Sequence, residues 1–415
     1  MTLRNLVLPP RGWRIDEETR AFTAFAVLGF TTTTVAPIVY AAAYLIIPFP
    51  RAVVVLIETL PALAVKLLLP HVLFVVPLWT RPLAIAAGWL VASVVIDYVA
   101  PNVHPPVRVL LTLLVAAAKS ASEVSFLVLA RNYGTVGLSG WGAGMGAGGA
   151  AIAVMPYMLT HRWGLFLRSA VGYNYYLIPL MLLAYYVLLP QPGNLAAPPN
   201  ADKDDLEEHI GGSALLLMQD PVSQPMPLHQ RIRQNLRLAS SLISPYMTPL
   251  FSAMAIQAVI FPGITRSLGV SSLFKAYAGY YAGYGLFFHL GNLIGCISIL
   301  GVRFQKPKPL LVRLGLVGGF VLLSAVFLFL SIPVVMFLVV LTAGLLCGAV
   351  YSNVFLSVMT DAGSGAATDR EFSLGIVGAG VTAGLLFGGV LGALLESGLC
   401  GLGLGSGQRW CHLVK

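Results

Sequence analysis

Eleven long apolar stretches follow one another along this chain and constrain its fold more than any other feature. A helix needs about 20 consecutive apolar residues to cross the hydrocarbon layer of a membrane. Each stretch has about this length, and prolines, glycines and charged residues separate it from the next. The stretches cover residues 21–47, 52–76, 82–100, 107–130, 137–160, 165–190, 243–262, 274–301, 310–331, 333–355 and 372–396. We therefore predict an all-α polytopic membrane protein with about 11 spans, and 12 spans remain the alternative.

The composition agrees with many spans and excludes an ordinary soluble domain. Hydrophobic residues make up 57% of the chain and charged residues 10%, whereas about 25% of residues are charged in typical soluble domains. With a cytosolic amino terminus, 15 lysines and arginines fall on the cytosolic side and 8 on the opposite side. Basic residues favour cytoplasmic loops in this way. We therefore attribute the net charge of +9 to membrane orientation and expect no binding to nucleic acid.

One polar segment divides the chain. We predict a six-helix half in residues 1–190, a cytosolic linker in 191–241, and a five-helix half with a glycine-rich tail in 242–415. The linker begins acidic and proline-rich (PPNADKDDLEEH) and ends basic (HQRIRQNLR), as expected for a disordered segment followed by an interfacial basic helix. Two halves joined by a cytosolic linker are typical of transporters built from repeats. No convincing sequence repeat relates the halves, so this inference rests on the number of stretches.

Several charged residues lie inside the predicted spans. A charge in the hydrocarbon layer is costly, so Glu58, Lys66 and Glu123 are candidates for a substrate or proton site. Glu58 and Lys66 are two turns apart on one helix, and both can face the same interior. The alternative is structural: Lys66 forms an ion pair with another helix or extends to the interface. Likewise Lys119, four residues before Glu123, can neutralise this carboxylate locally.

Polar residues of the second half give further candidates. His289 lies in the aromatic run YAGYYAGYGLFFHLGN, and histidine titrates near the pH difference between the cytosol and an acidic organelle. Tyr351 and Asn353 offer hydrogen-bond donors at membrane depth. The alternative for all three is a structural hydrogen bond inside the helix bundle.

The glycines and cysteines have structural interpretations. Glycines at close spacing in one apolar stretch predict a tight helix contact rather than a phosphate-binding loop; they are Gly140, Gly142, Gly144, Gly146 and Gly148. Cys400 and Cys411 of the tail are available for oxidation if the tail is lumenal. The chain has no nucleotide-binding loop, nucleophile elbow or metal-ligand spacing. We therefore expect no enzyme activity, catalytic residue, metal or cofactor.

Four motifs, in order along the chain, resemble those of the battenin family, which includes the Batten disease protein and its fungal vacuolar relatives. They are LIETLPALAVKLLLP from Leu56, SEVSFLVL with LSGWGAGMGAGG from Ser122, GLLCGAVYSNVF from Gly344 and DREFSLG from Asp369. The tail, with GQRWC ending at Cys411, is similar to fungal members in particular. The family resembles the major facilitator superfamily, so the resemblance implies a bundle of two helical halves.

The chain departs from the family pattern at several polar positions. Thr32 and Thr33 stand where relatives have an asparagine pair, and Gln257 stands in place of a glutamate. His289 begins the segment that replaces a Ser-Arg-Ser pattern, and Ala343 replaces an acidic residue. Gln257 and His289 therefore join the candidates for the substrate or proton pathway. The departures lie mostly in the second half and put proton coupling and the binding of anionic substrates in doubt.

The resemblance implies a function in the membrane of the vacuole or lysosome, with the amino terminus cytosolic. The expected activity is transport, or regulation of transport, that affects vacuolar pH and basic amino acids such as arginine. Basic amino acids and glycerophosphodiesters are the expected substrates, and protons and the lipid bilayer are further expected partners. The alternative is a divergent paralogue that does not transport and acts as a scaffold, recruiting trafficking proteins through its linker.

Overall fold

The computed structural model describes residues 16–44, 51–98, 105–190, 228–268, 276–304, 307–328, 332–361, 367–402 and 411. Within these ranges every regular element is a helix and no strand is present. The acidic and proline-rich part of the predicted linker lies outside the described residues.

The helices before the linker follow the predicted stretches closely. They are α1 Glu17–Tyr44, α2 Arg51–Val72, α3 Arg81–Tyr98, α4 Pro105–Ala130, α5 Gly134–Tyr157 and α6 Asn174–Leu183. Helical turns over Leu167–Tyr173 and Ala184–Leu188 extend α6 at its two ends. These turns give the short α6 the length of a span.

The basic end of the linker forms a helix, α8, that leads into the second half. The helices here are α8 Leu228–Leu242, α9 Thr248–Ala258, α10 Tyr277–Ile297, α11 Lys308–Phe327, α12 Pro333–Asp361 and α13 Ala367–Leu402. A π-helical turn, Ile243–Met247, joins α8 to α9, and a second one, Val259–Gly263, extends α9.

The number of spans agrees with the prediction of about 11. Ten segments of the described chain are long and apolar enough to cross a membrane, and one of them, 57 residues long, contains both α4 and α5. The two helices separate at Gly134, whose φ of 58° ends the first helical path. Glycine adopts this left-handed conformation at little cost because it has no Cβ. Counting α4 and α5 separately gives eleven spans and confirms the predicted all-α fold.

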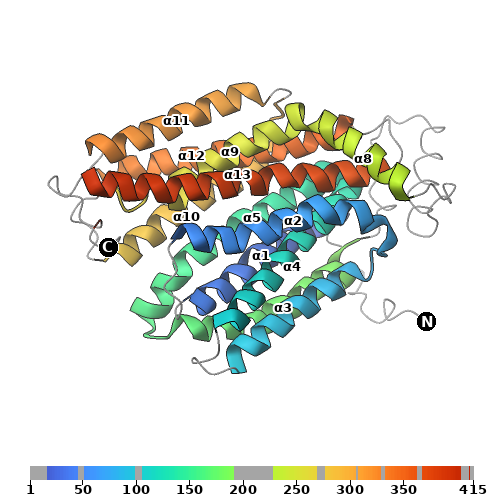
Figure 1. The fold of residues 1–415 in the computed structure, drawn as a ribbon, viewed down its shortest axis with the longest axis horizontal. Coiled ribbons are helices and arrows are strands. Elements are labelled where there is room, and N and C mark those ends of the chain that lie inside the picture. The colour runs from blue at the N-terminus through green and yellow to red at the C-terminus, as the bar shows by residue number, and fades with distance from the viewer. Residues whose placement is uncertain are drawn as a thin grey trace.

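The two halves pack side by side. Figure 1 shows α11 at one edge of the bundle and α3 at the opposite edge, with α2, α5 and α13 between them. Before the linker, α1 packs on α5 and α2 packs on α4. After it, α10 packs on α12 and α9 packs on α13. The halves meet where α5 contacts α10 and where α2 contacts α13.

The glycines of α5 allow two of these contacts. Along one face, Gly140, Gly144 and Gly148 lie against the backbone of α1. On the other face, a Cβ at Gly142 would lie 2.5 Å from the Cys296 Cβ of α10, and one at Gly146 would lie 2.6 Å from the Leu293 Cβ. Small residues let helices approach this closely in membranes. Alternating glycines thus make α5 the helix that joins α1 to the second half.

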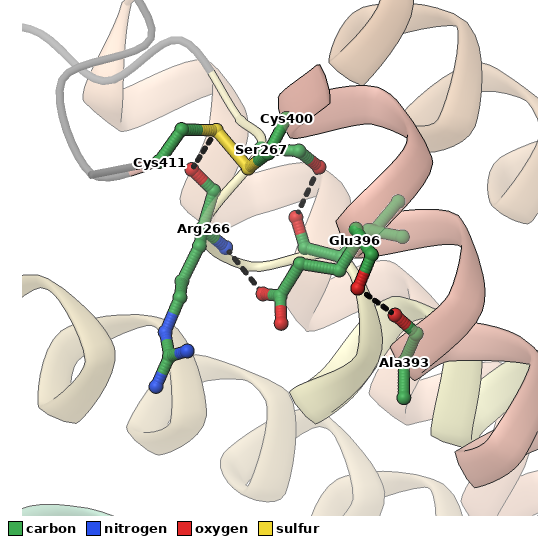
Figure 2. Close-up of a disulfide and its surroundings, with 8 residues drawn as sticks. Arg266, Ser267, Ala393, Glu396, Cys400 and Cys411 are labelled. Carbon is green, nitrogen blue, oxygen red and sulfur yellow. Dashed lines mark hydrogen bonds between the residues drawn. A yellow bond between two sulfur atoms is a disulfide. The ribbon is translucent and has the colours of Figure 1, made fainter. Parts of the chain in front are cut away.

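The carboxyl-terminal end of α13 is tied back to the bundle. Cys400 forms a disulfide with Cys411, with their Cα atoms 5.3 Å apart. Figure 2 shows this bond beside Arg266, whose backbone N–H donates to a carboxylate oxygen of Glu396 at 3.1 Å. Glu396 is buried, so the hydrogen bond satisfies an oxygen that water does not reach freely.

Candidate functional site

The centre of the candidate site is an ion pair between α2 and α4. The Nζ atom of Lys66 lies 2.5 Å from a carboxylate oxygen of Glu123. The Lys66 side chain is only 4% exposed, whereas that of Glu123 is 19% exposed. Two opposite charges can be accommodated inside a membrane protein when they neutralise each other. Glu123 is the more exposed partner of the pair.

Helices of both halves surround this pair. Lys119, one turn before Glu123 on α4, interacts electrostatically with the same carboxylate. On α13, a Cβ at Gly378 would lie 3.7 Å from the Cδ atom of Lys66. The glycine leaves room for the lysine stem between the helices. The ion pair thus lies where α2 and α4 of the first half meet α13 of the second.

An aromatic group next to Glu123 also joins the halves. The indole N–H of Trp141 on α5 donates to the hydroxyl oxygen of Tyr351 on α12, at 3.2 Å. Phe126, one turn after Glu123, packs edge-to-face on Trp141 with ring centres 6.1 Å apart. Tyr351 interacts electrostatically with Glu123. The structure therefore brings Glu123, Lys66 and Tyr351 together from three helices.

A hydroxyl pair links α4 to α1 beside this group. The Oγ atom of Ser122 lies 3.2 Å from the Oγ1 atom of Thr32, and both residues are buried. Ser122 also donates to the carbonyl oxygen of Lys119, at 2.7 Å. Thr32 thus forms a polar contact between α1 and α4.

A second ion pair closes one end of the bundle. Arg81, at the start of α3, pairs with Glu371, near the start of α13, at 2.8 Å. The same guanidinium donates to the carbonyl oxygens of Leu73 and Val76 beyond the end of α2. Arg81 is buried, and these two backbone hydrogen bonds and the ion pair satisfy its guanidinium away from water. This interaction joins the first half to the second at the end where α13 begins.

Neighbouring contacts extend this closure to α8. The ring of His71, near the end of α2, lies 5.0 Å from the ring of Phe372 on α13. The Nδ1 atom of His71 lies 3.2 Å from the side-chain nitrogen of Asn235 on α8. The linker helix therefore contacts both halves at the same end as Arg81 and Glu371.

Gln257 on α9 and His289 on α10 are two further candidates in the second half. The Oε1 atom of Gln257 and the Nδ1 atom of His289 are buried and have no hydrogen-bond partner among the described residues. One turn after Gln257, Phe261 leaves the helical conformation, with φ −141° and ψ 122°. Its ring lies edge-on to that of His289 at 5.6 Å. Irregular backbone at membrane depth is tolerated where protein or a cavity surrounds it.

The remaining candidates are Glu58 and Asn353. Glu58 is partly exposed on α2, two turns before Lys66. Asn353 is buried, and its side-chain oxygen accepts from the Phe304 N–H at 2.8 Å while its nitrogen donates to the Ala349 carbonyl at 2.7 Å. Both polar atoms of this amide are thus hydrogen-bonded to the backbone. No group of His, Cys, Asp and Glu in the described part of the chain is suited to hold a metal ion.

A family model, described as CLN3 protein, matches residues 23–402. The chain belongs to the CLN3 protein family. This match confirms the resemblance to the battenin family. Protein btn-1 of Neurospora crassa is 27% identical to this CLN3-family chain, covering 96% of it and 92% of the relative. Protein BTN1 of Eremothecium gossypii is 26% identical, covering 96% and 100%.

Solved structures of facilitators share the fold of this CLN3-family protein. The proton:xylose symporter XylE of the major facilitator superfamily aligns with a TM-score of 0.58 and 12% identity, covering 96% of this chain and 92% of its own. The Escherichia coli fucose:proton symporter aligns with a TM-score of 0.51 and 12% identity, covering 96% and 100%. At this identity the likeness concerns the fold alone. It confirms the predicted facilitator-like bundle.

Two residues of this CLN3-family site were not candidates in the sequence. Trp141 stands in the Gly-Trp-Gly segment, where the glycines drew attention to packing rather than to the indole N–H. Arg81 is one basic residue beside a proline, and its partner Glu371 lies far away in the chain, in the DREFSLG motif. Trp141 could have been found by its place in a family motif, and Arg81 by its place at the boundary of a span. Neither position indicates which residue is the interaction partner.

Proposed function

We propose that this CLN3-family protein is a secondary transporter of the vacuolar or lysosomal membrane and that Glu123 is its protonation site. The observation that carries the proposal is the Lys66–Glu123 ion pair, which lies at the contact between the two halves. In a facilitator-type fold these halves rock against each other around a central site. An ion pair at such a contact is sensitive to both protonation and movement.

The chemistry of the pair suggests how proton and solute are linked. When Glu123 binds a proton, it loses its charge and no longer neutralises Lys66. A buried ammonium without a counter-charge is unfavourable, so an anionic group on the solute replaces the carboxylate. The carboxylate of arginine and the phosphate of a glycerophosphodiester both meet this requirement. Tyr351 and Trp141, which are already bonded to each other, lie in position to contact the rest of the solute.

The second ion pair supplies a contact that must open during transport. Arg81 and Glu371 belong to different halves, so separation of the halves at this end breaks their salt bridge. The bias of basic residues places this end on the cytosolic side. The Cys400–Cys411 disulfide lies at the other end of α13, and disulfides persist in oxidising compartments such as an organelle lumen. Both features support a cytosolic amino terminus.

Family membership supports the compartment and the physiological role that we propose. The relatives include several fungal proteins named BTN1. As a vacuolar transporter, the protein would take part in vacuolar pH homeostasis and in the level of basic amino acids. Movement of protons with solute connects these two effects.

The test is uptake into vesicles that hold the purified full-length protein. Labelled arginine and a labelled glycerophosphodiester are supplied separately, with and without an imposed pH gradient. We expect gradient-dependent uptake of one solute class that Glu123→Gln abolishes. Glu18→Gln, an exposed carboxylate at the start of α1, is the matched control and keeps uptake at the parent level. The proposal would be contradicted if the folded parent took up neither solute, with or without the pH gradient.

A non-transporting scaffold is the second proposed function, because Asn353, a candidate pathway residue of the second half, has a structural role. Both polar atoms of the Asn353 amide are hydrogen-bonded to backbone, so this amide is not available to a solute. A scaffold would act through the linker. Deletion of residues 195–225 would then abolish the cellular phenotype while vesicle uptake stays absent. Full cellular activity of this deletion excludes the scaffold.

A further inference from the structure

Helix α8 has an inner face that is already used. Asn235 is buried against α2, with its amide nitrogen 3.2 Å from the Nδ1 atom of His71, and Leu242, seven residues later, is buried as well. Residues seven positions apart lie on nearly the same side of a helix. This face holds α8 against the bundle.

A second face of α8, continued by the first residue of the π-helical turn that follows it, carries an exposed apolar stripe. Ile232, Leu236 and Ile243 are 38%, 58% and 52% exposed. Their spacing of four and seven residues places them along one line on the helix surface. The stripe lies beside the inner face and makes no part of the contact with α2. Three large aliphatic side chains exposed in a row mark an interaction surface.

Positive charge adjoins this stripe. Arg233 and Arg237 are exposed and four residues apart, so they project from the same side of α8. The helix contains no aspartate or glutamate, and the sequence has none between Asp220 and Asp361. These arginines therefore have no acidic neighbour on their own helix. An apolar stripe next to a basic one is the pattern of a helix that lies in a membrane interface.

We propose that α8 lies on the cytosolic leaflet and binds anionic phospholipids. Ile232, Leu236 and Ile243 enter the boundary of the acyl chains, and Arg233 and Arg237 bind the headgroup phosphates and carboxylates. The turn Ile243–Met247 connects α8 directly to the membrane-spanning α9, so the helix starts from the bilayer surface. The cytosolic leaflet is the one that is rich in anionic lipid.

A competing occupant exists within the chain. The acidic part of the linker, residues 202–208, is rich in aspartate and glutamate and has the charge to contact Arg233 and Arg237. Its one apolar side chain, Leu206, is too little to cover Ile232, Leu236 and Ile243 together. A bilayer satisfies both the charge and the apolar stripe, which is why we assign the surface to lipid.

The experiment places a fluorescent probe on the stripe. Leu236→Cys is labelled with bimane in the full-length protein, in which Cys296 and Cys347 are buried and Cys400 and Cys411 are disulfide-bonded. The labelled protein is placed in nanodiscs of phosphatidylcholine with increasing phosphatidylserine. We expect the emission to shift to the blue as phosphatidylserine rises. High salt is expected to reverse the shift, because salt screens exposed charges.

Arginine variants test the charge. One basic residue near an anionic surface contributes about 1 kcal/mol, which is about a fivefold change in affinity. Arg233→Gln with Arg237→Gln should therefore raise the midpoint of the shift at least fivefold in phosphatidylserine content or move it out of range. Arg162→Gln, an exposed arginine outside α8, is the matched control and leaves the midpoint unchanged.

Three outcomes would overturn the proposal. The first is an emission spectrum that is the same with and without phosphatidylserine. The second is a double arginine variant with the parent's midpoint. The third is a blue shift in pure phosphatidylcholine after deletion of residues 201–208, which would show that the acidic segment occupies the surface. None of these measurements uses transport, so they are independent of the proposed activity.

Discussion

Lys66 on α2 and Glu123 on α4 neutralise each other across 2.5 Å at the contact between the two halves of the bundle. The sequence left three roles open: Lys66 as the counter-charge of Glu58 and Glu123, Lys66 in an ion pair with another helix, and Lys119 as the local neutraliser of Glu123. The structure pairs Lys66 with a residue of another helix, Glu123. Lys119 remains within electrostatic range as a second cation. The Glu123 carboxylate therefore lies near two lysine ammonium groups.

Removal of one member of this pair should destabilise the protein more than removal of both. Lys66→Gln and Glu123→Gln each leave a charge in a poorly hydrated place, at an expected loss of about 2 to 4 kcal/mol, somewhat below a fully buried pair because Glu123 is partly exposed. The double variant should recover about 1 to 3 kcal/mol. Thermal unfolding in detergent, followed by size-exclusion chromatography, measures all four proteins. Additive losses in the double variant would show that the pair is not coupled.

The salt bridge between Arg81 and Glu371 should hold closed the end of the bundle at which α13 begins. Glu371→Gln is expected to weaken this closure, and Arg81→Glu to weaken it more, because the latter places two acidic side chains together. Exchange of the two charges should restore closure only in part, since Arg81 also donates to the carbonyls of Leu73 and Val76. Distances between spin labels at Trp79→Cys and Thr360→Cys report the opening. An unchanged distance distribution in Arg81→Glu would contradict this role.

The packing of α5 should tolerate no side chain at Gly146. An added methyl would lie 2.6 Å from the Leu293 Cβ, and overpacking of this kind costs about 1 to 3 kcal/mol. Gly146→Ala should therefore lower the midpoint of thermal unfolding. Gly172→Ala is the matched control, because no atom lies within 4 Å of a Cβ there. Equal midpoints for the two variants would mean that α5 and α10 move apart without cost.

The disulfide predicts a defined count of reactive thiols. The chain has four cysteines, and Cys296 and Cys347 are free. After denaturation without reductant, a maleimide carrying a polymer tag should therefore add two tags to the parent, and four after reduction. Cys400→Ser should add three tags without reductant, because Cys411 is released. Four tags on the unreduced parent would show that the bond does not form in the cell.

Loss of this bond should also lower stability. The two cysteines are 11 residues apart. A disulfide that closes a loop of this length stabilises the protein by about 3 kcal/mol, because it reduces the entropy of the unfolded chain. Cys411→Ser is therefore expected to lower the unfolding midpoint, and the parent in reductant should show a similar loss. A variant that keeps the parent's midpoint would show that the hydrogen bond between Arg266 and Glu396 fixes this end without the disulfide.

Local patterns were sufficient for some features of the protein. The lengths of the apolar stretches predicted eleven spans because the thickness of the hydrocarbon layer fixes the length of a helix that crosses it. The motifs around Glu123 and Tyr351 predicted the family. The spacing of Gly140, Gly144 and Gly148 predicted a tight contact. It did not predict α1 as the partner on that face and α10 on the other, because small residues permit an approach without specifying the neighbour.

Hydrophobic length and motif order can be read from the chain alone, and they were enough to predict a helical membrane protein of the battenin family. The partners of the buried polar groups appear only in the folded bundle, where Lys66 meets Glu123, Trp141 meets Tyr351, and Arg81 meets Glu371. Each of these contacts depends on how helices far apart in sequence rotate and pack. Charges and hydrogen-bond donors inside a bilayer need partners, but the sequence does not say which helix supplies them.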